Sequence, residues 1–313
     1  MSLPVLDFAR FRAGDGAARS AFAEDLGRAC RETGFLLLTG HAVAPEARAA
    51  VFAAARGFFA RPEAEKAALS IARSAHNRGW VAERVEALDP AAGPDVKEAF
   101  NIGLDLAPDH PEVLAGKPFR GMNLWPQDEA FRAACLAWFD ACLGLGAALH
   151  RAFALDLGLG EAWFEDRFRA PLATLRLLRY PPGGDGLGAG AHTDYGSVTL
   201  LATDGEPGLE VRARESDAWI EVPQVEDAFV VNIGDCLERW TNGVYVSTPH
   251  RVRAPARERI SVAFFLDPDP DAVVAALPGT TGPDRPARWA PTTGADHLRE
   301  RLDATYAHRR EGA

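Results

Sequence analysis

The sequence has 313 residues and a formal net charge of −10, with 47% hydrophobic and 25% charged residues. These are ordinary values for a globular protein, and a chain of this length buries enough surface on folding to need no disulfide or structural metal. The acidic balance argues against nucleic acid and anionic membrane surfaces as partners, because both attract basic patches.

The first 70 residues are predicted to alternate short strands with helices. Apolar residues such as Phe22 and Leu26 recur at helical spacing, and Gly34 stands where the first long helix should end. The predicted elements are a strand at 3–8, a helix at 17–33, a buried strand at 35–38, a helix at 45–60 and a short helix at 62–69.

The middle of the chain changes character twice. Residues 70–125 contain many glycines, prolines and aspartates with weak periodicity, so we expect loops and short strands there, including one at 97–103. Apolar residues return at three- and four-residue steps over 127–157, which predicts a long helix. A short helix is expected at 161–168.

After Pro171 the sequence consists of short apolar segments separated by turn residues, a pattern typical of an all-β sandwich or barrel. The segment 259–266 contains a continuous apolar run, so we expect a strand covered on both faces, one of them by the N-terminal helices. The proline-rich stretch 268–291 should be an excursion from the core, followed by a helix at 295–307. The predicted strands are 172–180, 197–204, 208–212, 218–222, 228–234, 244–252 and 259–266.

Three residues are candidates for a metal site. His192 and Asp194 lie two positions apart, and in an extended segment such side chains point the same way, so both could bind one ion. The glycine-rich stretch before them is expected to be a loop that approaches the site. A third ligand must come from elsewhere, and His250 in STPHRV is the candidate. Two histidines and one carboxylate on one face of an ion form the facial triad of non-haem Fe(II) oxygenases.

A second group of residues could bind an anion. Arg259 and Ser261 share one face of the strand at 259–266, and Ala263 on the same face leaves room for a ligand. Arginine can hold a carboxylate with two parallel hydrogen bonds, and the serine hydroxyl adds a donor. Tyr180, at the end of an earlier strand, could donate to the same carboxylate. The alternatives are a surface or salt-bridged arginine and a tyrosine that serves only the core.

Cysteine usage and the N-terminal sequence favour a cytoplasmic protein. Cys30, Cys135, Cys142 and Cys236 include no C-x-x-C pair, so neither a zinc site nor a redox motif is indicated, and free buried thiols are expected. The first residues lack the pattern of a signal peptide, and no uncharged apolar run reaches the roughly 20 residues that span a bilayer.

The combination of HTD, STPHRV and RISVAFF resembles the isopenicillin N synthase-like family of 2-oxoglutarate/Fe(II)-dependent dioxygenases. The resemblance covers nearly the whole chain. PVLDFARF, CRETGFLLLTGH and FFARP are similar to that family's N-terminal region, and LRYPP, HTDYGSVTLLATD, GLEV, VNIGD and LERWTNG to its catalytic core.

The resemblance implies a mainly β core, a double-stranded β-helix (jelly roll) with α-helices packed on it. We expect residues 1–125 to form an α/β region integrated with this core and residues 126–170 to give helical support. Residues 171–313 should form the double-stranded β-helix with a C-terminal helix.

The resemblance also implies the chemistry of the site. His192, Asp194 and His250 would bind Fe(II), and Arg259 and Ser261, assisted by Tyr180, would bind the distal carboxylate of the co-substrate 2-oxoglutarate. With O₂, the enzyme would hydroxylate, desaturate or cyclise a small organic molecule that the sequence does not identify.

Two other functions remain open from the sequence alone. The family includes oxidases that use no 2-oxoglutarate and keep an R-x-S pair for a substrate carboxylate. A non-catalytic jelly-roll protein that binds a metal or small molecule is the other alternative.

Plant members usually have an asparagine where this chain has Leu178, which puts one accessory contact in doubt. Phe100 and Asn101 are candidates for the wall of the substrate pocket, and the sequence leaves the oligomeric state unknown.

Overall fold

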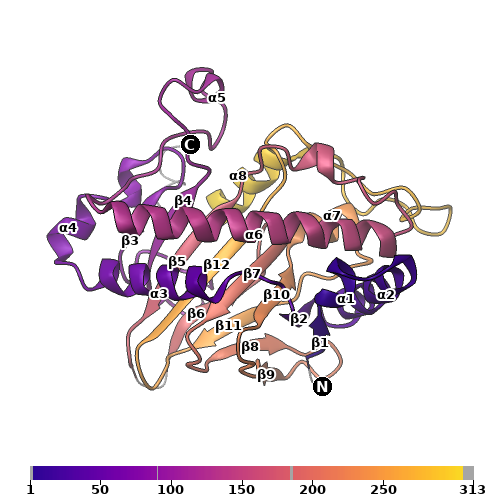
Figure 1. The fold of residues 1–313 in the computed structure, drawn as a ribbon, viewed down its shortest axis with the longest axis horizontal. Coiled ribbons are helices and arrows are strands. Elements are labelled where there is room, and N and C mark those ends of the chain that lie inside the picture. The colour runs from indigo at the N-terminus through magenta and orange to yellow at the C-terminus, as the bar shows by residue number, and fades with distance from the viewer. Residues whose placement is uncertain (1–2, 90, 184–185, 306–313) are drawn as a thin grey trace.

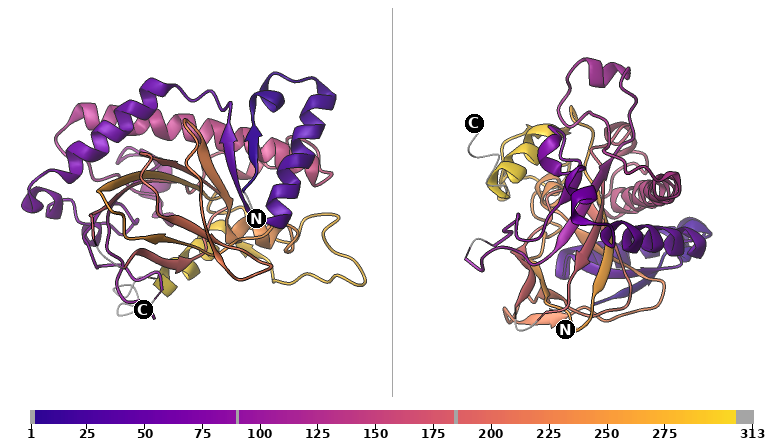
Figure 2. Two further views of the ribbon diagram at one scale, coloured as in Figure 1. Left: turned by 90° about the horizontal axis from the view of Figure 1, so that it is seen from below. Right: turned by 90° about the vertical axis from the view of Figure 1, so that its left-hand side faces the viewer.

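The computed structural model describes residues 3–89, 91–183 and 186–305. Its centre is an eight-stranded sheet that faces a smaller four-stranded sheet (Figures 1 and 2). The larger sheet has the order β1 (Val5–Asp7), β2 (Phe35–Thr39), β10 (Phe229–Ile233), β7 (Val198–Thr203), β12 (Arg259–Leu266), β5 (Thr174–Tyr180), β4 (Glu98–Gly103) and β3 (Gly79–Val81). The smaller sheet has the order β6 (Leu187–His192), β11 (His250–Arg253), β8 (Leu209–Arg212) and β9 (Trp219–Glu221). This is the predicted jelly-roll core.

Helices cover one face of the larger sheet (Figure 1). The long ones are α2 (Gly16–Glu32), α3 (Pro45–Phe59) and α6 (Glu129–Asp156), close to their predicted bounds. The C-terminal helix α8 (Gly294–Thr305) lies elsewhere, against the turn that follows β6. Shorter elements are α1 (Ala9–Arg12), α4 (Glu63–Ala67), α5 (Pro111–Leu114), α7 (Asp235–Trp240), the 3-10 turns Ile71–Arg73 and Glu165–Arg167, and the strand pair β13 (Val273–Val274) and β14 (Thr292–Thr293).

The main hydrophobic core fills the space between these helices and the larger sheet. In β12, Val262 and Phe264 belong to this core, whereas Ser261 and Ala263 line a cavity on the opposite face. Both faces of this strand are therefore covered, which explains why its sequence is apolar without alternation. The strand alternation also directs every second side chain of β12 and β5 toward the cavity.

Helix α6 is the one described helix that is long and apolar enough, by length and composition, to cross a membrane, with a hydropathy of 1.4 over its most apolar window. In this fold it packs against α2 and α3. Trp138 and Phe153 on its inner face are fully buried. The packing of this inner face in the core accounts for many of its apolar residues.

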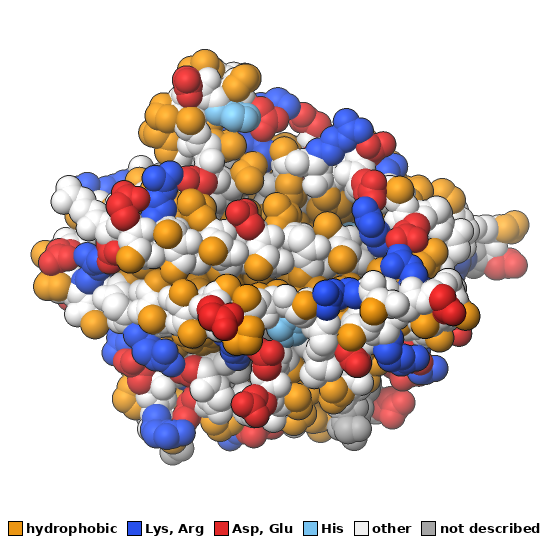
Figure 3. Space-filling view, viewed as in Figure 1, with side chains coloured by type: hydrophobic (Ala, Val, Ile, Leu, Met, Phe, Trp, Pro, Cys, Tyr) orange, Lys and Arg blue, Asp and Glu red, His pale blue; other side chains and the backbone are white. Residues whose placement is uncertain are grey.

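Charged side chains are interspersed on the face of the molecule that carries α3 and α6 (Figure 3). Basic and acidic residues alternate there, so the net charge does not gather into one acidic patch on this face. The cysteines at positions 30, 135, 142 and 236 are free and buried, as expected.

Several predicted elements were wrong. The second half of the glycine-rich segment before His192 belongs to a strand, β6, because it pairs with β11, and residues 184–185 of that segment lie outside the described residues. Only the end of the predicted strand 244–252 is extended, as β11, because residues 244–249 follow α7 as turns and irregular chain. The predicted helix 161–168 is reduced to turns around Glu165–Arg167. Helix α7 was not predicted, and residues 306–307 of the predicted last helix lie outside the described residues.

Candidate active site

A cavity of about 140 Å³ lies between the two sheets. Its walls come from β2, β4, β5, β7, β10 and β12 of the larger sheet and from β6, β8 and β11 of the smaller one. Helix α8 contributes Leu298 and Leu302. All six residues singled out by the sequence as iron or carboxylate ligands line this one cavity. They are Tyr180, His192, Asp194, His250, Arg259 and Ser261.

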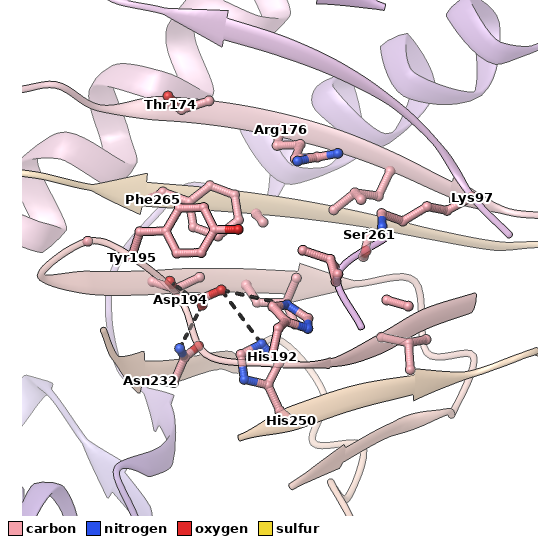
Figure 4. Close-up of a pocket in the computed structure, with 18 of the residues that line it drawn as sticks. Lys97, Thr174, Arg176, His192, Asp194, Tyr195, Asn232, His250, Ser261 and Phe265 are labelled. Atoms are coloured by element: carbon pink, nitrogen blue, oxygen red, sulfur yellow. Dashed lines mark hydrogen bonds and ion pairs between the residues drawn. The ribbon is translucent and has the colours of Figure 1, made fainter. Parts of the chain in front are cut away.

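The pairing of β6 with β11 brings the two predicted histidine ligands together. His192 ends β6, His250 begins β11, and the two are direct cross-strand partners. Asp194 follows in the turn after β6, and its Oδ1 lies 3.9 Å from His192 Nε2 and 3.6 Å from His250 Nε2 (Figure 4). One ligand atom from each of the three residues lies within 4.8 Å of the others, which is close enough to hold one metal ion.

The remaining polar atoms of these side chains are held by the protein. His192 Nδ1 lies 2.7 Å from the carbonyl oxygen of Gly190, and His250 Nδ1 lies 3.2 Å from that of Thr248. An Nδ1–H that donates to a carbonyl leaves Nε2 as the metal-binding nitrogen.

Asp194 is oriented in a similar way. Its Oδ2 accepts hydrogen bonds from Thr199 Oγ1 (2.6 Å) and Asn232 Nδ2 (2.7 Å). Oδ1 is therefore the oxygen that faces the histidines. Sequence reasoning missed Thr199 and Asn232, and the only available signal was that both fall in segments quoted for the family resemblance.

Burial sets the charges of the cluster. It lowers the pKa of His192 to about 3, and the neighbouring His250 acts in the same direction, so His192 is neutral at physiological pH. Burial alone would raise the pKa of Asp194, but the two imidazoles and the bonds from Asn232 and Thr199 outweigh it and hold that pKa below its ordinary value. Two imidazoles and one carboxylate are the donor set that fits Fe(II).

The candidate anion site lies on β12 and β5. Arg259 is only 1% exposed, and among the described residues no carboxylate lies within ion-pairing distance of its guanidinium. Its Nη1 donates to Ser261 Oγ (3.3 Å) and its Nε to the carbonyl oxygen of Glu206 (3.2 Å), but Nη2 has no partner in the described part of the chain. The guanidinium lies over the ring of Tyr180, its cross-strand partner, at 5.0 Å.

A buried guanidinium is costly unless an anion meets it. The unpartnered Nη2 and the adjoining cavity therefore fit a carboxylate. The burial of Arg259 disagrees with a surface arginine, and the lack of a carboxylate within ion-pairing distance among the described residues disagrees with a salt-bridged one.

The two residues predicted for the pocket wall, Phe100 and Asn101, lie on opposite faces of β4. Asn101 lines the cavity, whereas Phe100 lies in the core on the other face of β4, so its assignment to the pocket was wrong. Leu178, where an asparagine was expected from plant relatives, lines the cavity as part of an apolar stretch of wall. The polar wall residues Glu86, Lys97 and Arg176 were not anticipated.

Two family models match the chain. Residues 3–128 match the model of the non-haem dioxygenase in morphine synthesis N-terminal region, and residues 172–268 match that of the 2OG-Fe(II) oxygenase superfamily. Among curated relatives, the 2-oxoglutarate-Fe(II) type oxidoreductase hxnY of Emericella nidulans is 34% identical over 97% of this chain and 90% of that protein. Clavatol oxidase claD of Penicillium crustosum is 35% identical over 97% of both chains.

Solved structures agree with these relatives. A full-length Neurospora crassa protein in complex with alpha-KG and thymine has a TM-score of 0.85 at 31% identity, covering 96% of each chain. A 2OG-Fe(II) oxygenase family protein from Caulobacter crescentus has a TM-score of 0.86 at 30% identity, covering 96% of this chain and 99% of that one.

Similarity of this extent, together with the cavity and its ligand cluster, defines a non-haem iron oxygenase. The chain belongs to the 2OG-Fe(II) oxygenase superfamily. It is an oxidoreductase that uses Fe(II), 2-oxoglutarate and O₂ to oxidise a small molecule.

Proposed function

We propose that His192, Asp194 and His250 bind the Fe(II) of this oxygenase. The observation that carries the proposal is the convergence of Asp194 Oδ1 with the Nε2 atoms of both histidines. The other polar atoms of all three side chains are already engaged by the protein, so each residue has one atom left for the ion.

We propose further that Arg259, Ser261 and Tyr180 bind the distal carboxylate of 2-oxoglutarate. Arg259 offers the unpartnered Nη2, and Ser261 Oγ lies beside Nη1 of the same guanidinium. The cavity that holds both groups also has apolar wall residues, among them Leu178, Leu201 and Val252, which suit the methylene groups of the co-substrate.

When bound, Fe(II) and 2-oxoglutarate activate O₂ for oxidation of the substrate. The protein's own part is to hold and shield the reactants. The clamp fixes one end of the co-substrate, the hydrogen bonds on Nδ1 and Oδ2 fix the ligand atoms, and the apolar walls exclude water. Hydroxylation, desaturation and cyclisation are all outcomes that such a site can support.

We propose that residues 1–125 are an integral part of the catalytic unit, with 126–170 as support and 171–313 as the catalytic core. Strands β1–β4 belong to the same eight-stranded sheet as β5, β7, β10 and β12, which favours one folding unit. We also propose a cytoplasmic location, which four free, buried thiols support because such thiols are typical of a reducing compartment.

The metal assignment is tested by changing each ligand to alanine. We expect His192→Ala, Asp194→Ala and His250→Ala each to lose Fe(II) binding and turnover while keeping the circular dichroism spectrum of the folded protein, because two ligands remain where three are needed. His110→Ala is the matched control, since His110 caps the short helix α5. Activity equal to wild type at limiting iron would remove the altered residue from the site.

A further inference from the structure

The cavity has a second polar wall, which the metal ligands and the carboxylate clamp do not use. Asn101 on β4, Arg176 on β5 and Ala263 on β12 form one row across three neighbouring strands, and all three line the cavity. Because Ala263 is small, it leaves space beside Arg176. Figure 4 shows Arg176 across the cavity from His192 and His250. A molecule bound here would lie above the metal site.

In the described part of the chain, the charged side chains of this wall pair with one another. Arg176 Nη2 lies 2.5 Å from Glu86 Oε2, and Lys97 Nζ lies 3.3 Å from the same oxygen and also pairs with Asp95. The side chains of Glu86, Asp95 and Lys97 are at most 4% exposed. Among the described residues, buried Lys97 and partly buried Arg176 are thus matched by two buried carboxylates. A substrate carboxylate would leave this wall with an uncompensated negative charge, which is unfavourable in a buried site. A neutral oxygen acceptor adds no such charge.

The side chain of Asn101 indicates that a molecule bound at this wall must carry a hydrogen-bond donor. This side chain is 1% exposed, and its Oδ1 has no hydrogen-bond partner in the described part of the chain. Its Nδ2 makes only a long contact, 3.5 Å, to the carbonyl oxygen of Asn77. A buried acceptor without a donor is destabilising, so a bound N–H or O–H would satisfy it.

The wall continues with aromatic side chains. Phe265, one row further along β12, and Tyr195, which follows Asp194, both line the cavity (Figure 4). We propose that the substrate is a small, neutral, planar ring compound that carries a carbonyl or phenolic oxygen beside an N–H or O–H group. Arg176 donates to the oxygen, Asn101 accepts from the neighbouring donor, and Tyr195 and Phe265 contact the ring. Glu86 is a positioning residue for Arg176. This assignment rests on the proposed iron and 2-oxoglutarate sites.

The test uses two matched pairs of probes, salicylamide with salicylate and thymine with orotate, in which the second member carries a carboxylate. Binding to the anaerobic Fe(II)–2-oxoglutarate enzyme is measured by calorimetry, and stimulated succinate formation is measured in air. We expect the neutral member to bind roughly tenfold or more tightly than the anion in at least one pair. Preference for the anion, or no binding by either neutral probe while 2-oxoglutarate binds normally, would overturn the proposal.

Variants test the residues. Arg176→Gln should weaken the neutral probe roughly tenfold or more without changing the affinity for 2-oxoglutarate or Fe(II), and Asn101→Ala should weaken it independently of the ion cluster. Arg179→Gln is the matched control, because Arg179 lies on the same strand but does not line the cavity and pairs with Glu98 and Glu258. Probe binding unaffected by both Arg176→Gln and Asn101→Ala would place the substrate elsewhere.

Glu86→Gln gives the sharpest prediction, because it leaves the wall with a net positive charge. In this variant, the ratio of affinities for the neutral and the carboxylate-bearing probe of a pair should shift toward the carboxylate-bearing probe. A simple loss of structure would not produce this shift. An unchanged preference in a folded Glu86→Gln protein would contradict the charge argument. If the wild-type enzyme did not bind 2-oxoglutarate, the proposed clamp would fail, and this assignment with it.

Discussion

At the scale of single residues, Asp194 uses its two carboxylate oxygens for different purposes. Oδ2 accepts from Thr199 and Asn232, so Oδ1 is left facing His192 and His250. Because Thr199 and Asn232 are neighbouring partners on β7 and β10, the sheet itself fixes the orientation of this carboxylate. Polar groups that hold a metal ligand in this way commonly change metal affinity 10–100-fold when they are lost.

We therefore predict that Thr199→Val lowers Fe(II) affinity by about 10–100-fold, because Asp194 loses one of the bonds that orient it. The measurement is an anaerobic Fe(II) titration followed by calorimetry. Thr203→Val on the same strand is the control, since the Thr203 hydroxyl bonds to Gln224 at the surface. Equal iron affinity in the Thr199 variant and the wild type would show that Asn232 alone is sufficient.

A second prediction concerns the carboxylate clamp. Arg259→Lys should weaken 2-oxoglutarate binding roughly tenfold or more, because lysine keeps the charge but loses the planar fork that grips two oxygens. Ser261→Ala should cost less, since a hydroxyl is a neutral donor. Both are checked by titrating 2-oxoglutarate at saturating Fe(II), with iron affinity expected to stay unchanged. A lysine variant that binds as tightly as wild type would make Arg259 a structural residue.

The residues nearest the chemistry were the ones that the sequence could indicate. His192 and Asp194 share one short segment, and Arg259 and Ser261 share one face of a strand, so their spacing alone predicts proximity. Thr199, Asn232 and Arg176 could not be assigned in this way. Their roles depend on which strands become neighbours, and a threonine, asparagine or arginine in a strand has many ordinary uses.

At the scale of elements, the long helices were predictable because their apolar faces repeat at helical spacing. Strand β6 was not, because its glycines have low strand propensity and the strand forms through pairing with β11. The strand that contains β11 was predicted too long, at 244–252, because residues 244–249 include β-branched and aromatic residues that favour strands. In the structure these residues follow helix α7 as turns and irregular chain. In both β6 and residues 244–249, tertiary contacts outweighed the local preference of the residues for or against a strand.

Two glycines test whether the backbone at the junction of α2 and β2 requires glycine. Gly34, after α2, has a φ of +67°, and a Cβ there would lie 2.2 Å from the carbonyl oxygen of Val246. Gly34→Ala should lower the free energy of unfolding by at least about 1–2 kcal/mol, because both the left-handed backbone and this contact oppose a side chain.

The matched change is Gly57→Ala, inside α3, where a Cβ meets nothing within 4 Å. It should raise the free energy of unfolding by about 0.5–1 kcal/mol, since alanine favours the helix. Urea denaturation measures both. Opposite signs are the expected result, and an unchanged stability in Gly34→Ala would show that the junction of α2 and β2 relaxes freely.

At the scale of the whole molecule, one cavity joins contributions from segments far apart in the chain. Strand β4 supplies Asn101, β5 supplies Arg176, β12 supplies Arg259, and the β6–β11 pair supplies the histidines. The jelly-roll class could be predicted from short strands and the family resemblance. The neighbours of each strand, and hence the walls of the substrate site, required the structure.

The most direct test of the central claim is an anaerobic crystal structure of the protein with Fe(II) and 2-oxoglutarate. We predict an anomalous iron signal bound by Asp194 Oδ1 and by the Nε2 atoms of His192 and His250. The distal carboxylate of 2-oxoglutarate should lie within hydrogen-bonding distance of Arg259. Iron at another position, or a co-substrate carboxylate that does not contact Arg259, would contradict the assignment of these residues.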